Sequence, residues 1–226
     1  MNTVLVTGGA SGLGAAVAAA VIDEGGRAIV LDKAAPTAAV TDFVPVDLSD
    51  SAAAEQAVAE AVDRNGGLDG VVTAAGIDSC GQLDQVSTED WERVVRVNLL
   101  GTVAVVRAAL PHLERSRGRV VTVASTLGLR ALPDATAYCA SKFGIVGFTR
   151  ALAAETAGRI GVTLLVPGGM RTSFFDGRAE QYRPPDMNKL NAPENVAATV
   201  VHVLNQPPGC EVRELVVCAS NEPSWP

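Results

Sequence analysis

The chain has 226 residues, a formal net charge of -7 and a hydrophobic fraction of 48%. This length and apolar content predict one folded domain over residues 1–226 with a substantial core. The acidic balance excludes the basic surface with which proteins bind nucleic acid, and no polybasic membrane patch is present. We therefore expect the partners to be small molecules or further copies of the chain.

The beginning of the sequence predicts no targeting segment. Met1 leads directly into a candidate strand, without an apolar signal core or cleavage site. We also expect no later apolar run to be long enough to span a bilayer. The four cysteines lack CxxC or His-paired metal spacing, and a chain of this size does not need disulfides. We expect a reduced, cytoplasmic protein without a metal site.

Short β-branched runs alternate with longer Ala-rich helical stretches, which is typical of βαβ units and a parallel sheet buried on both faces. Seven strands are predicted, at residues 3–7, 27–31, 43–46, 70–73, 119–124, 161–166 and 212–218. Pro45 cannot donate to a strand ladder, so the third strand should lie at a sheet edge. The pattern predicts an α/β, Rossmann-like doubly wound sheet of mainly parallel strands in the order 3-2-1-4-5-6-7, with helices on both faces.

A glycine loop follows the first predicted strand. Gly8, Gly12 and Gly14 predict a tight turn into a helix that begins near Ser11. Glycine removes the Cβ atoms that would block a close ligand, and a helix N-terminus favours the negative charge of a pyrophosphate. Such a loop is weak evidence alone, because many glycine turns are only turns.

Acidic residues after the next two strands strengthen the assignment. Asp32 ends the second strand, where a carboxylate can accept from a ribose 2′-hydroxyl and repel a 2′-phosphate, so NAD is favoured over NADP. Lys33 is the counter-evidence, because it could pair with a phosphate, although a solvated lysine is more ordinary. Asp47 could accept from the adenine amino group or could be the N-cap of the following helix.

Tyr138 and Lys142 lie four residues apart, on one face of a predicted helix, where the ammonium can favour the phenolate and make tyrosine a usable base. Ser125 ends the fifth strand and could hydrogen-bond a substrate oxygen, although alone it would be read as a turn serine. Asn98 falls within the apolar stripe of a helix that begins after residues 87–90. Its buried amide could satisfy backbone groups at a helix distortion, hold an internal water, or do both.

These motifs, with the segment Pro167-Gly168-Gly169-Met170-Arg171-Thr172, resemble the single-domain branch of the short-chain dehydrogenase/reductase family over nearly the whole chain. The resemblance implies that Tyr138 is the general acid/base, that Lys142 lowers its pKa and contacts the nicotinamide ribose, that Ser125 orients the substrate oxygen and that Asn98 holds a relay water. The residues expected to bind the cofactor are Gly8, Ser11, Gly12, Leu13, Gly14, Asp32, Asp47, Leu48, Ala74, Ala75, Gly76, Tyr138, Lys142, Pro167, Gly168 and Thr172. Thr73 departs from the family, which usually has Asn there, and puts the local rigidity of the neighbouring strands in question.

The motifs predict an NAD(H)-dependent oxidoreductase that interconverts a secondary alcohol and a ketone. Two alternatives remain: a nicotinamide-binding regulatory or scaffold protein, and an NADPH-dependent ketoacyl-thioester reductase. Residues 174–193 form the candidate substrate lid. The candidate pocket residues are Ile77, Leu127, Leu129, Leu132, Met170, Phe174 and Phe175, which suggest a lipophilic or ring-bearing substrate.

Two expectations concern the assembly and the C-terminus. By the family resemblance, the helices of Tyr138 and Asn98 form the contact of a homodimer, often within a homotetramer. Small residues on the Tyr138 helix, Gly144, Gly147 and Ala151, would allow another helix to approach closely. Trp225, between two prolines, suggests a docked end, although a surface aromatic on a mobile tail is the alternative.

Overall fold

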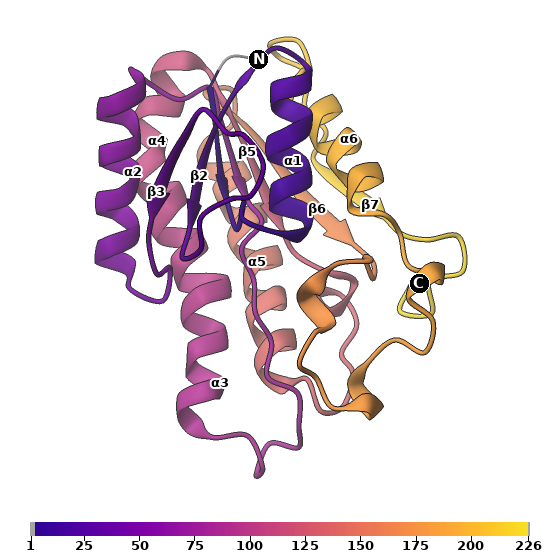
Figure 1. Ribbon diagram of the computed structural model, residues 1–226. Coiled ribbons are helices and arrows are strands. Elements are labelled where there is room, and N and C mark those ends of the chain that lie inside the picture. The colour runs from indigo at the N-terminus through magenta and orange to yellow at the C-terminus, as the bar shows by residue number, and fades with distance from the viewer. Residues whose placement is uncertain (1–2, 226) are drawn as a thin grey trace.

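The computed structural model describes residues 3–225 and contains one seven-stranded sheet in the order β3-β2-β1-β4-β5-β6-β7 (Figure 1). Every neighbouring pair of strands is parallel. The strands are β1 (Thr3–Thr7), β2 (Arg27–Asp32), β3 (Asp42–Pro45), β4 (Gly70–Thr73), β5 (Arg119–Val123), β6 (Gly161–Pro167) and β7 (Glu214–Val217). The predicted fold class and strand order are confirmed.

Helices cover both faces of this sheet, as Figure 1 shows. The long helices are α1 (Gly12–Asp23), α2 (Ser51–Asn65), α3 (Thr88–Val95), α4 (Thr102–Ser116), α5 (Thr136–Glu155) and α6 (Pro193–Leu204). A π-helix, η1 (Arg96–Gly101), joins α3 to α4, and four short 3-10 helices are η2 (Thr126–Gly128), η3 (Ser173–Phe175), η4 (Glu180–Tyr182) and η5 (Met187–Lys189). Helices α1 and α6 pack on one face, and α2, α4 and part of α5 pack on the other.

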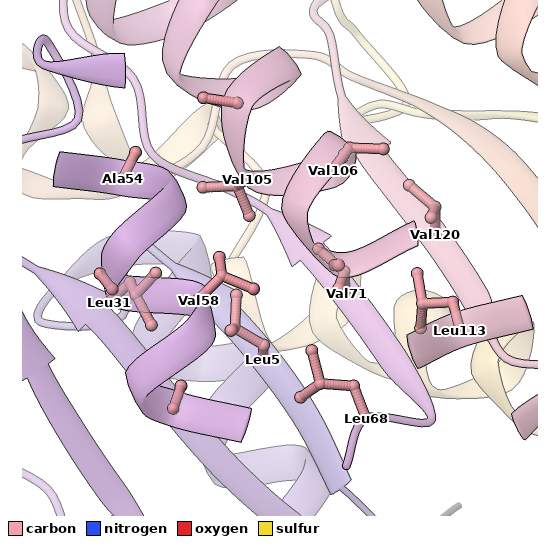
Figure 2. Close-up of a cluster of buried hydrophobic side chains, with 14 of the residues drawn as sticks. Leu5, Leu31, Ala54, Val58, Leu68, Val71, Val105, Val106, Leu113 and Val120 are labelled. Carbon is pink, nitrogen blue, oxygen red and sulfur yellow. The ribbon is translucent and has the colours of Figure 1, made fainter. Parts of the chain in front are cut away.

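The core between the sheet and helices α2 and α4 is built from branched aliphatic side chains (Figure 2). Leu5, Leu31 and Val71 reach it from the central strands, and Val58 and Val105 from the two helices. Each of these side chains is fully buried. Every residue of β1 and β4 is buried. Because helices cover both faces of these strands, their sequences do not alternate between apolar and charged residues. This rigid layer holds the carboxyl ends of the strands, where the candidate site lies.

Strand β3 confirms the expectation for Pro45. It pairs only with β2, and Pro45 is its last residue, opposite Asp32. The strand therefore lies at the sheet edge, where the missing N–H of proline breaks no ladder. Strand β7 is shorter than predicted, because residues 212 and 213 precede its ladder and Cys218 lies beyond it.

One expectation about apolar runs is wrong. Helices α3, η1 and α4 form a continuous helix, Thr88–Ser116, that is long and apolar enough by length and composition to cross a membrane. Half of its apolar window is buried inside the protein. Val105, Val106 and Leu113 of this helix lie in the core of Figure 2, so its apolar character is that of a core helix.

The segment between β6 and α6 contains no long helix or strand. Three short 3-10 helices, η3, η4 and η5, follow one another there, and a single bridge joins Met170 to Asn191 at its base. In Figure 1 this orange segment lies beside the part of α5 that extends beyond the sheet. It is the segment in which residues 174–193 were expected to form a lid.

The C-terminal residues dock on the same end of the molecule. Glu222 accepts a hydrogen bond from the backbone N–H of Gly169, and the hydroxyls of Ser224 and Thr126 lie 2.7 Å apart. Trp225 is 38% exposed. The described part of the tail is therefore held by hydrogen bonds, and Pro226 lies outside the described residues.

Candidate active site

The glycine loop is closed so tightly that side chains are excluded at two positions. A Cβ atom on Gly14 would lie 2.2 Å from the carbonyl oxygen of Gly8. Gly8 itself has a φ of +71°, and a Cβ there would lie 2.7 Å from the Cα of Ala75. Both glycines are therefore needed to bring β1, α1 and the end of β4 together.

Helix α1 begins at this loop with its first amide groups not capped by a side chain. Ser11 is the N-cap, and its hydroxyl makes no capping hydrogen bond. A Cβ on Gly12, whose φ is +53°, would approach Thr172 to 3.4 Å, so Thr172 faces the loop from the other side. Free N–H groups at the N-terminus of a twelve-residue helix, between small residues, fit the pyrophosphate of a dinucleotide.

Asp32 has a structural role that the sequence did not reveal. Its two carboxylate oxygens accept hydrogen bonds from the backbone N–H groups of Ala10 and Ala34, at 3.0 and 3.1 Å. The carboxylate thus fastens the glycine loop to the end of β2. It remains partly exposed, beside the loop where a ribose was expected.

Lys33 pairs with Asp47 across the ends of β2 and β3, with 2.8 Å between Nζ and Oδ2. This hydrogen bond, with one from the backbone N–H of Ser49, lowers the pKa of Asp47 to about 2. The N-cap alternative for Asp47 is wrong, because Asp50 caps α2 by accepting from Ala52 and Ala53. Asp47 instead closes the turn that precedes the cap.

Two of the expected cofactor residues have side chains that face the core. Leu13 and Leu48 are both 6% exposed and belong to the hydrophobic clusters on opposite faces of the sheet. Only their backbone groups could therefore reach a cofactor. Sequence position alone does not separate these roles.

The small residues after β4 bring the loop against the catalytic side chains. The N–H of Ala75 donates to the hydroxyl of Thr7. A Cβ on Gly76 would lie 3.6 Å from Oδ1 of Asn98 and 3.7 Å from Nζ of Lys142. Gly76 is thus the point where the predicted nucleotide and catalytic groups meet.

Asn98 lies within the π-helix η1 and is 1% exposed. Its Oδ1 accepts from the N–H of Ile77, and its Nδ2 donates to the carbonyl of Ile77 and to Ser141 Oγ. The amide therefore satisfies backbone groups, as one alternative expected, but these groups belong to Ile77 in the loop after β4 and not to the distorted helix itself. By holding both backbone groups of Ile77, Asn98 fixes the path of the chain past the predicted catalytic residues.

Tyr138 lies in the first turn of α5 at the carboxyl end of the sheet. Burial raises the pKa of Tyr138 to about 12, and a hydrogen bond with the Ser125 side chain opposes this increase. The shift is opposite in sign to the expected lowering by Lys142, because burial outweighs the groups that favour the phenolate. The phenol is thus protonated near neutral pH.

Lys142 lies one turn further along α5, and its Nζ is 5.6 Å from the centre of the Tyr138 ring. The ammonium donates a hydrogen bond of 2.9 Å to the carbonyl of Val123, at the end of β5. Burial lowers the pKa of Lys142 to about 8. A lysine so placed keeps its proton at pH 7 and loses it under mildly alkaline conditions.

Ser125 completes the group that the sequence predicted. It follows β5 and caps η2, accepting from the N–H of Leu127 at 3.1 Å. Its turn role and its contact with Tyr138 therefore coexist. The structure brings Ser125, Tyr138 and Lys142 together beside Gly76 and the glycine loop.

The predicted pocket residues differ in their surroundings. Leu129 and Met170 pack against the hydrophobic clusters, whereas Leu132 is 43% exposed. Phe174 lies against Tyr138, with 5.6 Å between ring centres, and Phe175 contacts Phe174 edge to face. Phe174 therefore brings residues 174–193, the expected lid, into contact with the site.

Sequence reasoning missed two charged residues here. Asp78 and Arg178 form an ion pair of 3.0 Å next to Phe174. They come from the loop after β4 and from residues 174–193, so no local spacing links them. Their pairing could be recognised only once the fold placed the two segments side by side.

Comparisons with known proteins agree with this geometry. A family model described as short chain dehydrogenase matches residues 2–183. L-fucose dehydrogenase of Mus musculus is 30% identical over 98% of this chain and 88% of its own length. The aldohexose dehydrogenase of Thermoplasma acidophilum superposes with a TM-score of 0.87 at 25% identity, covering 96% of this chain and 92% of that one.

A second solved structure has the same fold. The alcohol dehydrogenase of the archaeon Thermococcus sibiricus, in complex with 5-hydroxy-NADP, superposes with a TM-score of 0.87 at 23% identity. The superposition covers 97% of both chains.

Proposed function

This chain belongs to the short chain dehydrogenase family, and on that basis we propose that it is an NAD(H)-dependent oxidoreductase that interconverts a secondary alcohol and a ketone. The observation that carries the proposal is the convergence of Ser125, Tyr138 and Lys142 at the carboxyl end of the sheet. A protein that only binds a nicotinamide has no need of this group.

The glycine loop and the first turn of α1 would hold the pyrophosphate, and Asp32 the ribose of the adenosine half. Lys33 is engaged by Asp47, which supports NAD over NADP because this cation already has a carboxylate partner. Thr172 and Gly168 would flank the nicotinamide half. The bound dinucleotide would accept or return the hydride of the carbinol carbon.

The chain's own residues would handle the proton. In the reduction direction, the protonated phenol of Tyr138 donates its proton to the carbonyl oxygen, which Ser125 orients by a hydrogen bond. In oxidation the phenol oxygen takes the hydroxyl proton instead. A pKa of about 12 makes Tyr138 an acid throughout the neutral range, so the charged Lys142 is needed to favour the phenolate for oxidation.

The test combines cofactor binding with turnover. NADH and NADPH are titrated into the purified protein, followed by a panel of secondary alcohols, ketones and aldoses, the last because the relatives include a fucose and an aldohexose dehydrogenase. Tyr138→Phe should bind NADH normally and lose at least roughly 100-fold in kcat/KM. Tyr182→Phe, which removes the hydroxyl of the other tyrosine in the chain, should lose far less.

Two results would overturn parts of this proposal. Tighter binding of NADPH than of NADH would refute the role of Asp32 and favour the ketoacyl-thioester reductase alternative. NADH binding without turnover of any panel member, or full activity in Tyr138→Phe, would refute the catalytic assignment and favour a regulatory role.

A further inference from the structure

A largely buried ion pair lies close to Tyr138, on the other side of the Phe174 ring. Nη2 of Arg178, on the lid, lies 3.0 Å from Oδ2 of Asp78, and the two side chains are only 15% and 6% exposed. Asp78 directly follows Ile77, whose backbone Asn98 holds at both polar groups. The carboxylate is therefore rigidly placed, and the guanidinium reaches it from the lid.

The pair is one aromatic ring away from the reacting group. The Cζ atom of Arg178 lies 4.6 Å from the ring centre of Phe174 and 4.7 Å from that of Phe175. The Phe174 ring in turn lies on Tyr138 at 5.6 Å. Consistent with this proximity, the charge of Asp78 raises the pKa of Tyr138 and that of Arg178 lowers it.

The hydrogen-bonding capacity of the pair is not fully used. Nη2 of Arg178 is buried and makes no hydrogen bond, so its contact with Asp78 is an ion pair without hydrogen-bond alignment. The Asp78 oxygens accept from the N–H of Ser79 and the thiol of Cys80, which leaves acceptor sites on the carboxylate. A buried donor without a partner is costly, and a ligand oxygen that displaced the side chains covering Nη2 would remove that cost.

The charges of the pair indicate the class of ligand. An anionic substituent beside Arg178 would be repelled by Asp78, and a cationic one beside Asp78 would be repelled by Arg178. A neutral hydroxyl can accept from the guanidinium and donate to the carboxylate, so adjacent hydroxyls suit both groups without adding a buried charge. The Phe174 ring offers an apolar wall for the C–H face of a ring.

We propose that Asp78 and Arg178 are specificity-determining residues that bind the hydroxyl groups of a neutral polyhydroxylated ring, such as a sugar, beside the carbon that reacts at Tyr138. The proposal rests on the dehydrogenase function proposed above. It places the polar part of the substrate pocket between the loop after β4 and residues 174–193, in contact with the predicted pocket residues Phe174 and Phe175.

The test compares two kinds of lactol, whose ring CH–OH loses a hydride and a proton as a secondary alcohol does and becomes a lactone carbonyl. D-glucose and L-fucose carry several ring hydroxyls, whereas tetrahydropyran-2-ol has the same reacting group without them. Wild-type protein should show a kcat/KM at least tenfold higher for a sugar than for tetrahydropyran-2-ol. The double variant Asp78→Asn/Arg178→Gln leaves no unpaired charge. It should lose most of the preference for sugars, through a higher KM, because each lost hydrogen bond to a charged group accounts for a tenfold effect or more. Its kcat/KM for tetrahydropyran-2-ol should change less than about threefold.

A matched control removes an ion pair elsewhere. Glu55→Gln/Arg107→Gln eliminates an exposed pair of 3.3 Å between α2 and α4 and should leave the preference unchanged. If the Asp78/Arg178 variant slows both substrates equally, the pair only positions the lid and the proposal is wrong. It is also wrong if wild-type protein turns over tetrahydropyran-2-ol as efficiently as the sugars.

A binding measurement separates this proposal from the catalytic one. Sugar binding to Tyr138→Phe loaded with NADH is measured by isothermal titration calorimetry, with and without Asp78→Asn/Arg178→Gln. Binding that depends on the pair, without turnover in wild-type protein, would support the pair and refute the dehydrogenase function. Turnover of other alcohols without any sugar binding would refute the pair alone, and absence of both turnover and sugar binding would refute both.

Discussion

Lys142 is an ionisable residue in the protein interior that is only 4% exposed. Its ammonium group donates a hydrogen bond to the carbonyl of Val123. Burial lowers its pKa from 10.5 to about 8, a difference that corresponds to roughly 3 kcal/mol of lost stability while the group is charged. Below pH 8 the folded and unfolded chains both carry the proton, so the full penalty applies. It disappears as the pH rises from 8 to 10.5.

Lys142→Met should therefore abolish turnover and stabilise the fold at pH 7 by roughly 2 kcal/mol, less than the full penalty because the Val123 carbonyl loses its donor. The gain should shrink between pH 8 and 10.5. Urea unfolding of both proteins at pH 7 and at pH 9, below the ordinary pKa of tyrosine, measures it. An equal gain at both pH values would show that burial of the ammonium is not the cause.

Thr73 is the residue that departs from the family pattern, and its buried hydroxyl makes no hydrogen bond in the described part of the chain. Thr73→Val keeps the shape and removes an unsatisfied polar group, so it should increase the free energy of unfolding by about 1 kcal/mol. The departure would then be a cost in stability, separate from catalysis.

Thr122 provides the matched control, one strand away. Its hydroxyl lies 2.6 Å from that of Thr149, and both residues are buried. Thr122→Val leaves Thr149 without this partner and should lower the unfolding free energy by about 1 to 2 kcal/mol. Chemical denaturation measures the free energy of unfolding of both variants. A Thr73→Val protein less stable than the wild type would mean that the hydroxyl of Thr73 has a hydrogen-bond partner.

The C-terminal tail is an element whose contacts reach the site. Glu222 accepts from Gly169, and a Cβ on Gly168 would lie 2.4 Å from the same carboxylate, so the tail fixes the loop expected to flank the nicotinamide. Glu222→Ala should lower kcat/KM at least fivefold, because a part-buried N–H loses a charged acceptor worth roughly 2 kcal/mol. Steady-state kinetics with varied NADH measures this loss.

Glu222→Gln tests whether the acceptor or the charge matters. Glutamine keeps a carbonyl oxygen for Gly169 and should restore most of the activity that Glu222→Ala loses. Glu89→Ala, an exposed acid at the start of α3, controls for net charge and should behave as the wild type. If Glu222→Ala also retains full activity, the tail is docked without supporting the site.

At the level of elements, periodicity and turn residues predicted most of the fold. The bounds of β1 and β4 were predicted to the residue, and Pro45 placed β3 at the edge, because these features depend on local chemistry. One of the two alternatives for Asp47, the N-cap of α2, is wrong, since Asp47 and Asp50 both precede the helix and only the geometry separates them. The pair of Asp78 and Arg178 could not be predicted, because it depends on where the lid rests.

At the level of the whole molecule, η1 and α5 each carry an exposed apolar side chain. Leu100 and Phe143 are each 45% exposed, and a Cβ on Gly147, one turn after Phe143, would meet nothing within 4 Å. Apolar side chains grouped next to a small residue are typical of a helix contact with another chain. These side chains support the expectation of a homodimer or homotetramer.

Phe143→Glu should therefore lower the oligomeric state of the protein, because a carboxylate would be buried without a partner at the contact. Sedimentation velocity of wild type and variant measures the change. Leu83→Glu alters another leucine, 65% exposed on the loop after β4, and should leave the mass unchanged. A monomeric wild type, or an unchanged mass for Phe143→Glu, would contradict the contact.

Dissociation should also reduce turnover, because Phe143 follows Lys142 directly on α5. Adjacent helix residues face different directions, so the same turn presents Lys142 to the site and Phe143 to the surface. A partner packed on Phe143 would hold the start of α5, with Tyr138, against the sheet. Activity of Phe143→Glu should then rise with protein concentration, whereas a local effect on Lys142 would give a concentration-independent loss.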